Sequence, residues 1–297
     1  MKPADKKPLV LGFPDYLDEA HRFADAADMD CATIDIHHFP DGESLVRLPE
    51  ALPGDVLLFT SLDRPNARLV ELELAAGAAY DLGATRLTLV APYLCYMRQD
   101  IAFHPGEAVS QRIIGALLAR RFDTLVTVDP HLHLTKSLEA AIPVRHAVTL
   151  TAAPAMAAAL GERGDLPMLL GPDAESEQWV ARIAGMAGLD FGVARKRRAG
   201  DRDVHITLPD IDFAGRNVVL VDDVASTGQT LIEAALALGS RGVESISVMV
   251  THALFVGDAI KRLHAAGVTD ISSTDSIRHS TNRIPLAGLL ATGLDAC

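Results

Sequence analysis

The segment 218–230 reads Val-Val-Leu-Val-Asp-Asp-Val-Ala-Ser-Thr-Gly-Gln-Thr, an apolar run followed at once by paired acids and a small polar loop. The apolar run predicts a strand that is buried on both faces, as in a parallel sheet. Gly228 permits a tight turn in which successive backbone N–H groups point into one concavity at the start of a helix. Such a concavity favours a phosphate dianion, and Ser226, Thr227 and Thr230 supply hydroxyls to it.

The paired acids suggest a second function for the same segment. Asp222 and Asp223 lie where a ribose diol beside the phosphate would need hydrogen-bond acceptors. The alternative is an Asp-rich turn with a capping Ser or Thr. Because paired carboxylates next to a core are costly unless they serve a function, we favour the phosphate site. The segment resembles the ribose-5-phosphate loop of the type I phosphoribosyltransferase fold, and it is not a Walker A loop, since no Gly-Lys-Ser/Thr follows the glycine.

The remainder of the chain alternates apolar runs with stretches of helical period. Buried strands are predicted at Leu9–Gly12, Val56–Thr60, Leu87–Ala91, Leu125–Val128, Met168–Gly171, Val218–Val221 and Ile246–Thr251. Helices are predicted over Leu69–Gly83, over Ser110–Arg121 with Ser110 as a possible N-cap, and from Leu231 to Gly239. Strand–helix alternation of this kind predicts an α/β fold with parallel sheets.

The length of 297 residues corresponds to two domains at roughly 150 residues each. The Ile142-Pro143 step and the alanine-rich run that follows place the boundary within Val144–Thr151. We therefore expect one domain over residues 1–147 and another over 148–297. Each half carries an apolar strand that ends on an Asp-containing loop, which hints at two similar halves.

The composition excludes several classes of protein. With 49% hydrophobic and 22% charged residues the chain is globular, and three cysteines cannot form a disulfide scaffold but fit a reducing cytoplasm. A net charge of −12 argues against binding to nucleic acid or an anionic membrane. The apolar runs are far shorter than the roughly 20 residues that span a bilayer, and the first residues do not predict a secretory signal.

Two segments of the first half add polar groups that could bind a nucleotide. Residues 39–43 read Phe-Pro-Asp-Gly-Glu between two extended runs, which is typical of a hairpin tip. Residues 91–100 read Ala-Pro-Tyr-Leu-Cys-Tyr-Met-Arg-Gln-Asp after a predicted strand. Within this second segment, Arg98 offers a planar donor fork for phosphates, although a solvated loop would also explain it.

Two further segments could contact a polyphosphate. Residues 128–133 read Val-Asp-Pro-His-Leu-His at the end of another strand, where His131 could bind a metal or phosphate and His133 is expected to be structural. Residues 195–198 read Arg-Lys-Arg-Arg, and four consecutive cations repel one another unless they face water or an anion. As a solvated loop they are unremarkable, whereas as a mobile loop they could close over a polyphosphate and neutralise charge during transfer.

Taken together, these motifs resemble the ribose-phosphate pyrophosphokinases, also called phosphoribosyl pyrophosphate synthetases. The resemblance covers roughly residues 34 to 280, with the motifs in the order of the family. It implies an α/β fold with two phosphoribosyltransferase-like domains, each a mostly parallel sheet flanked by helices. Phosphoribosyltransferases share the phosphate loop but generally lack the Arg-Gln-Asp and Asp-Gly-Glu elements, which separates the two classes.

The resemblance also implies an activity and its site residues. The anomeric hydroxyl of ribose 5-phosphate attacks the β-phosphorus of ATP, with Mg²⁺ as cofactor, and AMP leaves. The implied ribose-5-phosphate residues are Asp222, Asp223, Ser226, Thr227, Gly228 and Thr230. The implied ATP-binding residues are Arg98, Gln99 and Asp100, together with Phe39, Asp41 and Glu43 from a neighbouring subunit, so that a homo-oligomer (a dimer or larger) is expected. Lys196, Arg198 and His131 are implied as catalytic residues, and His131 and Asp173 as metal-binding residues.

Three departures from the family pattern keep other functions open. Ala174-Glu175-Ser176-Glu177 stands where the family commonly has a Gly-Gly pair, Ile101 replaces a basic residue, and Ser226 replaces an acid. The first departure motivates the alternative of a non-catalytic regulatory homologue. Two alternatives remain. One is a phosphoribosyltransferase, and the other is diphosphoryl transfer to another sugar phosphate.

Overall fold

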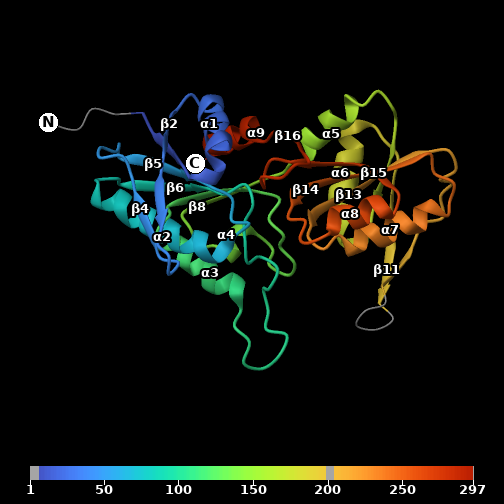
Figure 1. Cartoon of the computed structure of the whole chain (residues 1–297), viewed down its shortest axis with the longest axis horizontal. Coiled ribbons are helices and arrows are strands. Elements are labelled where there is room, and N and C mark those ends of the chain that lie inside the picture. Colours follow the sequence, from blue (N-terminus) through green and yellow to red (C-terminus); the bar gives the residue numbers. More distant parts are fainter. Residues whose placement is uncertain (1–6, 199–203, 297) are drawn as a thin grey trace. The chain divides into compact units, whose positions relative to one another are not determined.

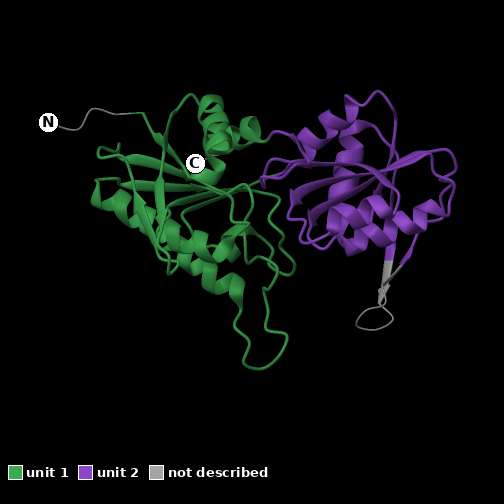
Figure 2. Cartoon of the chain, viewed as in Figure 1, with its two compact units in different colours: residues 1–150, 286–297 green, residues 151–285 purple. Residues whose placement is uncertain are grey.

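The protein consists of two compact units. This computed structural model describes residues 7–198 and 204–296, without the side chains of residues 196–198, 204, 205 and 296. Unit 1 comprises Met1–Leu150 and Leu286–Cys297, and unit 2 comprises Thr151–Pro285 (Figure 2).

Unit 1 contains a six-stranded, fully parallel sheet with the strand order β2-β1-β5-β6-β7-β8 (Figure 1). Its elements are β1 (Leu9–Gly12), η1 (Pro14–Tyr16), α1 (Leu17–Ala26), β2 (Asp30–Thr33), β3 (Asp35–His38), β4 (Ser44–Arg47), β5 (Asp55–Phe59), α2 (Pro65–Asp81), β6 (Arg86–Val90), α3 (Ser110–Ala119), β7 (Thr124–Val128), α4 (Leu138–Ala141), β8 (His146–Leu150), α9 (Ala287–Thr292) and η3 (Gly293–Ala296). Helices cover both faces of this sheet, which is why its central strands β1, β5, β6 and β7 are mostly apolar and buried along nearly their whole length.

Unit 2 contains a second six-stranded parallel sheet, with the order β10-β9-β13-β14-β15-β16. Its elements are α5 (Ala153–Gly161), β9 (Met168–Gly171), η2 (Ala174–Ser176), α6 (Glu177–Ala187), β10 (Phe191–Val193), β11 (Arg195–Arg198), β12 (Val204–Thr207), β13 (Asn217–Ala225), α7 (Gln229–Gly239), β14 (Ser245–Ala253), α8 (Ala259–Ala265), β15 (Val268–Thr274) and β16 (Asn282–Ile284).

The two units repeat one topology. Adding eight to each strand number of the first sheet gives the strand order of the second. The correspondence includes an antiparallel two-stranded ribbon, which is β3–β4 in unit 1 and β11–β12 in unit 2. The hint of two similar halves in the sequence therefore reflects a repeated fold.

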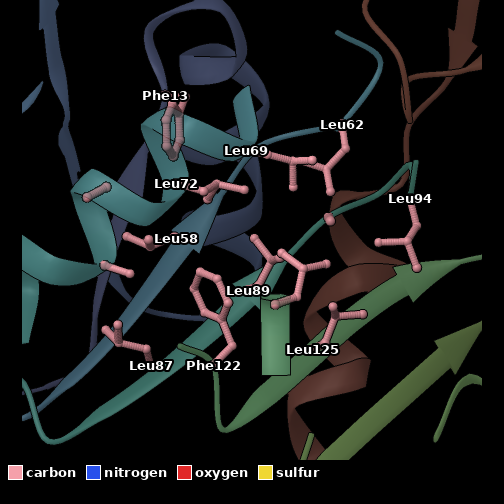
Figure 3. Packing of buried hydrophobic residues seen from close by; sticks show 14 of the residues in the cluster. Phe13, Leu58, Leu62, Leu69, Leu72, Leu87, Leu89, Leu94, Phe122 and Leu125 are labelled. Carbon is pink, nitrogen blue, oxygen red and sulfur yellow. The ribbon is translucent and has the colours of Figure 1, made fainter. Parts of the chain in front are cut away.

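The apolar face of α2 and the strands beneath it form the core of unit 1. Figure 3 shows Leu69 and Leu72 of α2 among side chains from the strands, including Leu58 and Leu89. Leu58 and Leu89 are fully buried. Burial of such a side chain contributes about 1.5–3 kcal/mol, so this contact fixes the position of α2 on the sheet.

The structure confirms the expected fold class and each predicted buried strand, with ends that shift by a few residues. Two local expectations are corrected. Ser110 is the first residue of α3 and Val109 occupies the N-cap, because the Ser110 hydroxyl bonds Gln99 instead of the helix. Residues 195–198, expected as a polar loop, form strand β11, because they pair with β12.

The domain division differs from the expected boundary at 147/148. The first boundary follows Leu150, three residues later than expected, and residues 286–297 return to unit 1. The reason lies in packing, since α9 contacts α1 and β7. Gly293 approaches so closely that a Cβ there would lie 2.9 Å from Val126 Cγ1 and 3.0 Å from Leu150 Cδ1.

One observation bears on membranes. Within residues 7–198 and 204–296, no helix is both long enough and apolar enough to cross a bilayer.

Two helical glycines of unit 1 provide a test of the packing. A Cβ at Gly115 would lie 2.0 Å from the Ala141 carbonyl oxygen, whereas a Cβ at Gly77 meets nothing within 4 Å. We expect Gly115→Ala to lower the free energy of unfolding of unit 1 by about 1–3 kcal/mol through overpacking. Gly77→Ala should raise it by about 0.5–1 kcal/mol, because alanine loses less backbone entropy in a helix. Calorimetric unfolding temperatures check both, and a Gly115→Ala protein as stable as the wild type would contradict the packing described.

Candidate active site

In the middle of the sheet of unit 2, between β9 and β13, the order in which successive strands are added reverses. From β9 the chain crosses to β10 on one side, and from β13 it crosses to β14 on the other. In open α/β sheets, ligands bind at the carboxyl ends of the strands at such a switch point. The predicted phosphate segment begins in β13 and therefore lies at this point.

Three carboxylates gather at the switch point. Asp173 follows β9, and Asp222 and Asp223 lie in β13, which pairs with β9. Burial of Asp222, with the charges of Asp223 and Asp173 adding to it, raises the pKa of the Asp222 carboxyl well above its ordinary value of 3.8. Each carboxylate also accepts a nearby backbone N–H: Asp222 Oδ1 from Asp223 at 3.0 Å, Asp223 Oδ1 from Val224 at 2.8 Å and Asp173 Oδ1 from Glu175 at 3.1 Å. Backbone N–H groups thus hold all three carboxyl groups at the switch point.

The loop after these acids has the backbone that the sequence predicts. Gly228 adopts a left-handed conformation (φ 68°, ψ 7°) at the N-cap of α7, so a side chain there would be strained. A neighbouring segment supports the loop, because the amides of Phe255 and Val256 donate to the carbonyls of Ala225 and Ser226 at 2.9 and 3.0 Å. The predicted ribose-5-phosphate residues therefore lie on one strand–loop–helix unit that begins an 11-residue helix.

The Arg-Gln-Asp segment of unit 1 combines one exposed cation with two internally bonded residues. The Gln99 amide oxygen accepts from the Ser110 hydroxyl. Asp100 Oδ2 accepts from the backbone amides of Leu134 and Thr135 at 2.6 and 3.2 Å. Arg98 is exposed. Asp100 thereby ties this segment to the loop that follows His131, a role that the sequence did not indicate.

His131 and His133 form a pair on that loop. Their Nε2 atoms lie 3.0 Å apart, with the rings edge to face and the centroids 4.5 Å apart. At this distance one nitrogen donates to the other, so the two rings fix each other's tautomer. The expectation that His133 is hydrogen-bonded fits this pair.

Residues 39–43 form the tip of the β3–β4 ribbon, as the sequence predicts. The Phe39 amide donates to the Glu43 carbonyl at 2.8 Å, and the Gly42 amide donates to the Phe39 carbonyl at 2.9 Å. The positive φ of 94° at Gly42 suits glycine. Phe39, Asp41 and Glu43 are all exposed at this tip, and Phe39 contacts His37 edge to face.

The predicted catalytic cations lie on the corresponding ribbon of unit 2. Lys196 and Arg198 are in β11, where they pair with Ile206 and Val204 of β12. The backbone of both residues is described, but their side chains lie outside the described part of the chain.

The repeated strand order and the acid–loop–helix segment define a two-domain protein of the phosphoribosyltransferase type. A family model for the N-terminal domain of ribose phosphate pyrophosphokinase matches residues 16–121, and a phosphoribosyl transferase domain model matches residues 150–278. The chain is 33% identical to the ribose-phosphate pyrophosphokinase of Methanopyrus kandleri, over 97% of this chain and 98% of that protein. It is 35% identical to ribose-phosphate pyrophosphokinase 2 of Archaeoglobus fulgidus, over 93% and 96% of the two chains.

These matches show that the chain belongs to the ribose-phosphate pyrophosphokinase family of enzymes. The crystal structure of phosphoribosylpyrophosphate synthetase from Mycobacterium smegmatis has the same fold, with a TM-score of 0.81 over 98% of both chains at 23% identity. The predicted family, enzyme class and two-domain α/β fold are confirmed.

The carboxylate cluster generates a prediction about stability and pH. Because the pKa of Asp222 is raised above its ordinary value, the folded state holds this proton at pH values where the unfolded state has lost it. Stability therefore falls as the pH rises through that interval. We expect Asp222→Asn, without ligand, to remove part of this fall at pH values above about 4. Unfolding temperatures across this range check it, and identical pH profiles for the two proteins would contradict it.

Proposed function

We propose that this chain catalyses the family reaction, in which the diphosphoryl group of ATP moves to ribose 5-phosphate. The anomeric hydroxyl oxygen forms a bond to the β-phosphorus, and the bond from that phosphorus to the oxygen bridging the α- and β-phosphates breaks. The hydroxyl proton is lost to solvent, and the products are phosphoribosyl pyrophosphate and AMP. The observation that carries this proposal is the carboxylate cluster beside a phosphate loop at the switch point of unit 2.

In this proposal, unit 2 binds ribose 5-phosphate. The N–H groups at the start of α7 hold the 5-phosphate, and the side chains of Ser226, Thr227 and Thr230 add donors beside Gly228. Asp222 and Asp223 accept hydrogen bonds from the ribose diol. The diol supplies two donors to carboxylates that otherwise repel one another, which favours the sugar over an anion at this position.

Unit 1 supplies the proposed nucleotide-binding residues. Arg98 offers an exposed guanidinium to the phosphates, and His131 contacts the nucleotide with its bound metal. Gln99 and Asp100 contribute by holding their loops, as their internal hydrogen bonds indicate. The tip of β3–β4 presents Phe39, Asp41 and Glu43 to the adenine end of ATP in a neighbouring subunit, so the proposal includes a homo-oligomer.

The residues of the carboxylate cluster fit the proposed cofactor, Mg²⁺. This ion takes oxygen ligands and keeps several waters, so that one or two carboxylates and a substrate oxygen are sufficient. Asp173 would hold it beside Asp222. When bound, the ion would neutralise phosphate charge. His131 has a nitrogen donor, which suits Mg²⁺ less well, so we assign it to the nucleotide or a metal-bound water.

The Ala174–Glu177 departure does not disturb Asp173. The segment forms η2 and begins α6, with Ser176 buried and its hydroxyl donating to the Asp173 carbonyl at 2.6 Å. Glu175 and Glu177 are exposed. Thus the acids lie on the surface while Asp173 remains at the cluster, and we favour the enzyme over a regulatory homologue.

The proposal includes a reducing cytoplasmic setting. Cys31 and Cys95 are free thiols. Burial is the main cause that raises the pKa of Cys31 to about 11 and that of Cys95 to about 12, so both remain protonated and unreactive.

A product assay tests the proposed reaction. Purified protein with Mg²⁺, ATP and ribose 5-phosphate should yield AMP and phosphoribosyl pyrophosphate in equal amounts and no ADP, as followed by phosphorus NMR. Formation of ADP would indicate transfer of the γ-phosphoryl group alone. The absence of AMP from a folded, ATP-binding sample would contradict the proposed reaction and favour a regulatory homologue or a different acceptor sugar.

Lys196 and Arg198 are proposed to neutralise charge that develops during transfer. An interaction made only in the transition state affects turnover more than substrate affinity. We therefore expect Lys196→Ala to lower kcat by about 100-fold or more, while the KM values change little. Steady-state kinetics check this, and an unchanged kcat would contradict the assignment.

A further inference from the structure

The β3–β4 ribbon needs an anchor outside its own strands. Two strands alone are at best marginally stable in water. Within the described residues, this ribbon forms its own two-stranded sheet and does not join the six-stranded sheet of unit 1. Ile36 and Val46 pack against the core, and β4 lies against α2. The apolar contacts hold the body of the ribbon, but the tip 39–43 is exposed.

A single buried carboxylate holds both ends of that tip. Glu71 of α2 is only 3% exposed. Its Oε1 lies 2.8 Å from His38 Nε2 and accepts from the Ser44 hydroxyl at 3.3 Å. A carboxylate only accepts, so His38 Nε2 is the donor. His38 and Ser44 are register partners, the last residue of β3 and the first of β4. The two bonds therefore close the ribbon where the tip begins.

Arg68 holds the charge of Glu71 in place. Arg68 Nη1 forms an ion pair with Glu71 Oε2 at 3.4 Å but no hydrogen bond, and Arg68 Nη2 donates to both oxygens of Asp15 at 2.6 Å. The guanidinium lies over the ring of Phe13, 4.4 Å from its centroid. Arg68 and Glu71 are both buried, so their ion pair is little screened by water, whereas Asp15 is half exposed. A rigid chain of contacts thus runs from the carboxyl end of β1 through Arg68 and Glu71 to the ribbon.

We propose that Glu71 is a positioning residue for ATP, acting through His38 and Ser44 on the tip 39–43. The inference rests on the proposed function, because that function assigns Phe39, Asp41 and Glu43 of the tip to ATP. An anchored tip is ordered before the nucleotide arrives, whereas an unanchored tip must lose conformational entropy when it becomes ordered on binding. Loss of the anchor therefore weakens ATP binding and leaves ribose 5-phosphate binding unaffected.

The first experiment measures the order of the tip without reference to activity. Hydrogen–deuterium exchange of the full-length protein is compared for wild type, Glu71→Ala and the milder Ser44→Ala. We expect faster exchange at the Phe39 and Gly42 amides in both variants, and unchanged exchange in β5 and β6. If Glu71→Ala does not fold, Ser44→Ala still tests the anchor, because it removes one hydrogen bond to the same Oε1. Unchanged tip exchange in a folded variant would overturn the proposal.

The second experiment measures the consequence for catalysis. We expect the KM for ATP to rise about tenfold in Glu71→Ala, the loss associated with hydrogen bonds to a charged group. The kcat and the KM for ribose 5-phosphate should stay within about twofold, because the interaction is made equally in the ground and transition states. His38→Ala should raise the KM for ATP as well, and the double variant should add little to Glu71→Ala. A uniform loss in all three parameters would indicate a merely structural role and would overturn the proposal.

The same ribbon offers a matched control. Arg47 Nη2 donates to Asp35 Oδ2 at 2.6 Å, an exposed ion pair between the same two strands at the end away from the tip. Arg47→Gln should change neither tip exchange nor the KM for ATP. A rise equal to that of Glu71→Ala would show that any weakening of the ribbon suffices, which contradicts a specific role for Glu71.

Failure of the proposed function has a different signature. If wild-type protein forms no AMP, the proposed reaction is wrong. Binding of ATP to the variants is then measured directly by calorimetry. Faster tip exchange with about tenfold weaker ATP binding supports the proposal, and equal ATP binding overturns it.

Discussion

The cost of placing two adjacent acids, the buried Asp223 and the half-buried Asp222, in the last part of β13 is the constraint on which the site of unit 2 depends. Asp222 and Asp223 follow four apolar strand residues in a strand whose two neighbours, β9 and β14, are both parallel to it. Backbone N–H groups hold both side chains, so the acids cannot separate to relieve their charge. Such an arrangement costs stability, and the raised pKa of Asp222 is the sign of that cost. A ligand that donates hydrogen bonds or carries positive charge relieves it.

Unit 1 has the same topology, but at its switch point the acid is paired with a cation of the protein. There the strand β1 is followed by Phe13-Pro14-Asp15, much as β9 is followed by Pro172-Asp173. Arg68 binds both oxygens of Asp15 and lies on the ring of Phe13, so a side chain of the protein neutralises the acid. In unit 1 the acid after β1 is therefore paired with a cation of the same chain, and this cation also pairs with Glu71, which holds the ribbon.

The sequence predicts those features that follow from local patterns. Apolar runs locate the central strands because both of their faces are buried, and the order of the acids, hydroxyls and glycine in 218–230 locates the phosphate loop. The two ribbons differ in this respect. The Asp41-Gly42 turn signals β3–β4, whereas charge repulsion in 195–198 argued against the strand that cross-strand pairing with β12 produces. Glu71 and Arg68 carried no signal, because an acid and a base on an Ala/Leu-rich helix are normally solvated. Both are buried, with His38 and Ser44 in contact with Glu71, and Phe13 and Asp15 in contact with Arg68.

The repeated topology gives the two ribbons a common physical meaning. In the chain, each ribbon lies between the second and third strands of the parallel sheet of its unit. Each ribbon is a short antiparallel pair that is not part of that sheet. Diphosphoryl transfer requires alignment and charge neutralisation more than covalent catalysis. In the proposed mechanism, the ribbon of unit 1 supplies alignment of the nucleotide and the ribbon of unit 2 supplies the cations. A ribbon that orients a nucleotide must be ordered in advance. The buried Glu71–Arg68 pair provides this order for β3–β4, because Glu71 bonds the two residues that flank the exposed five-residue tip.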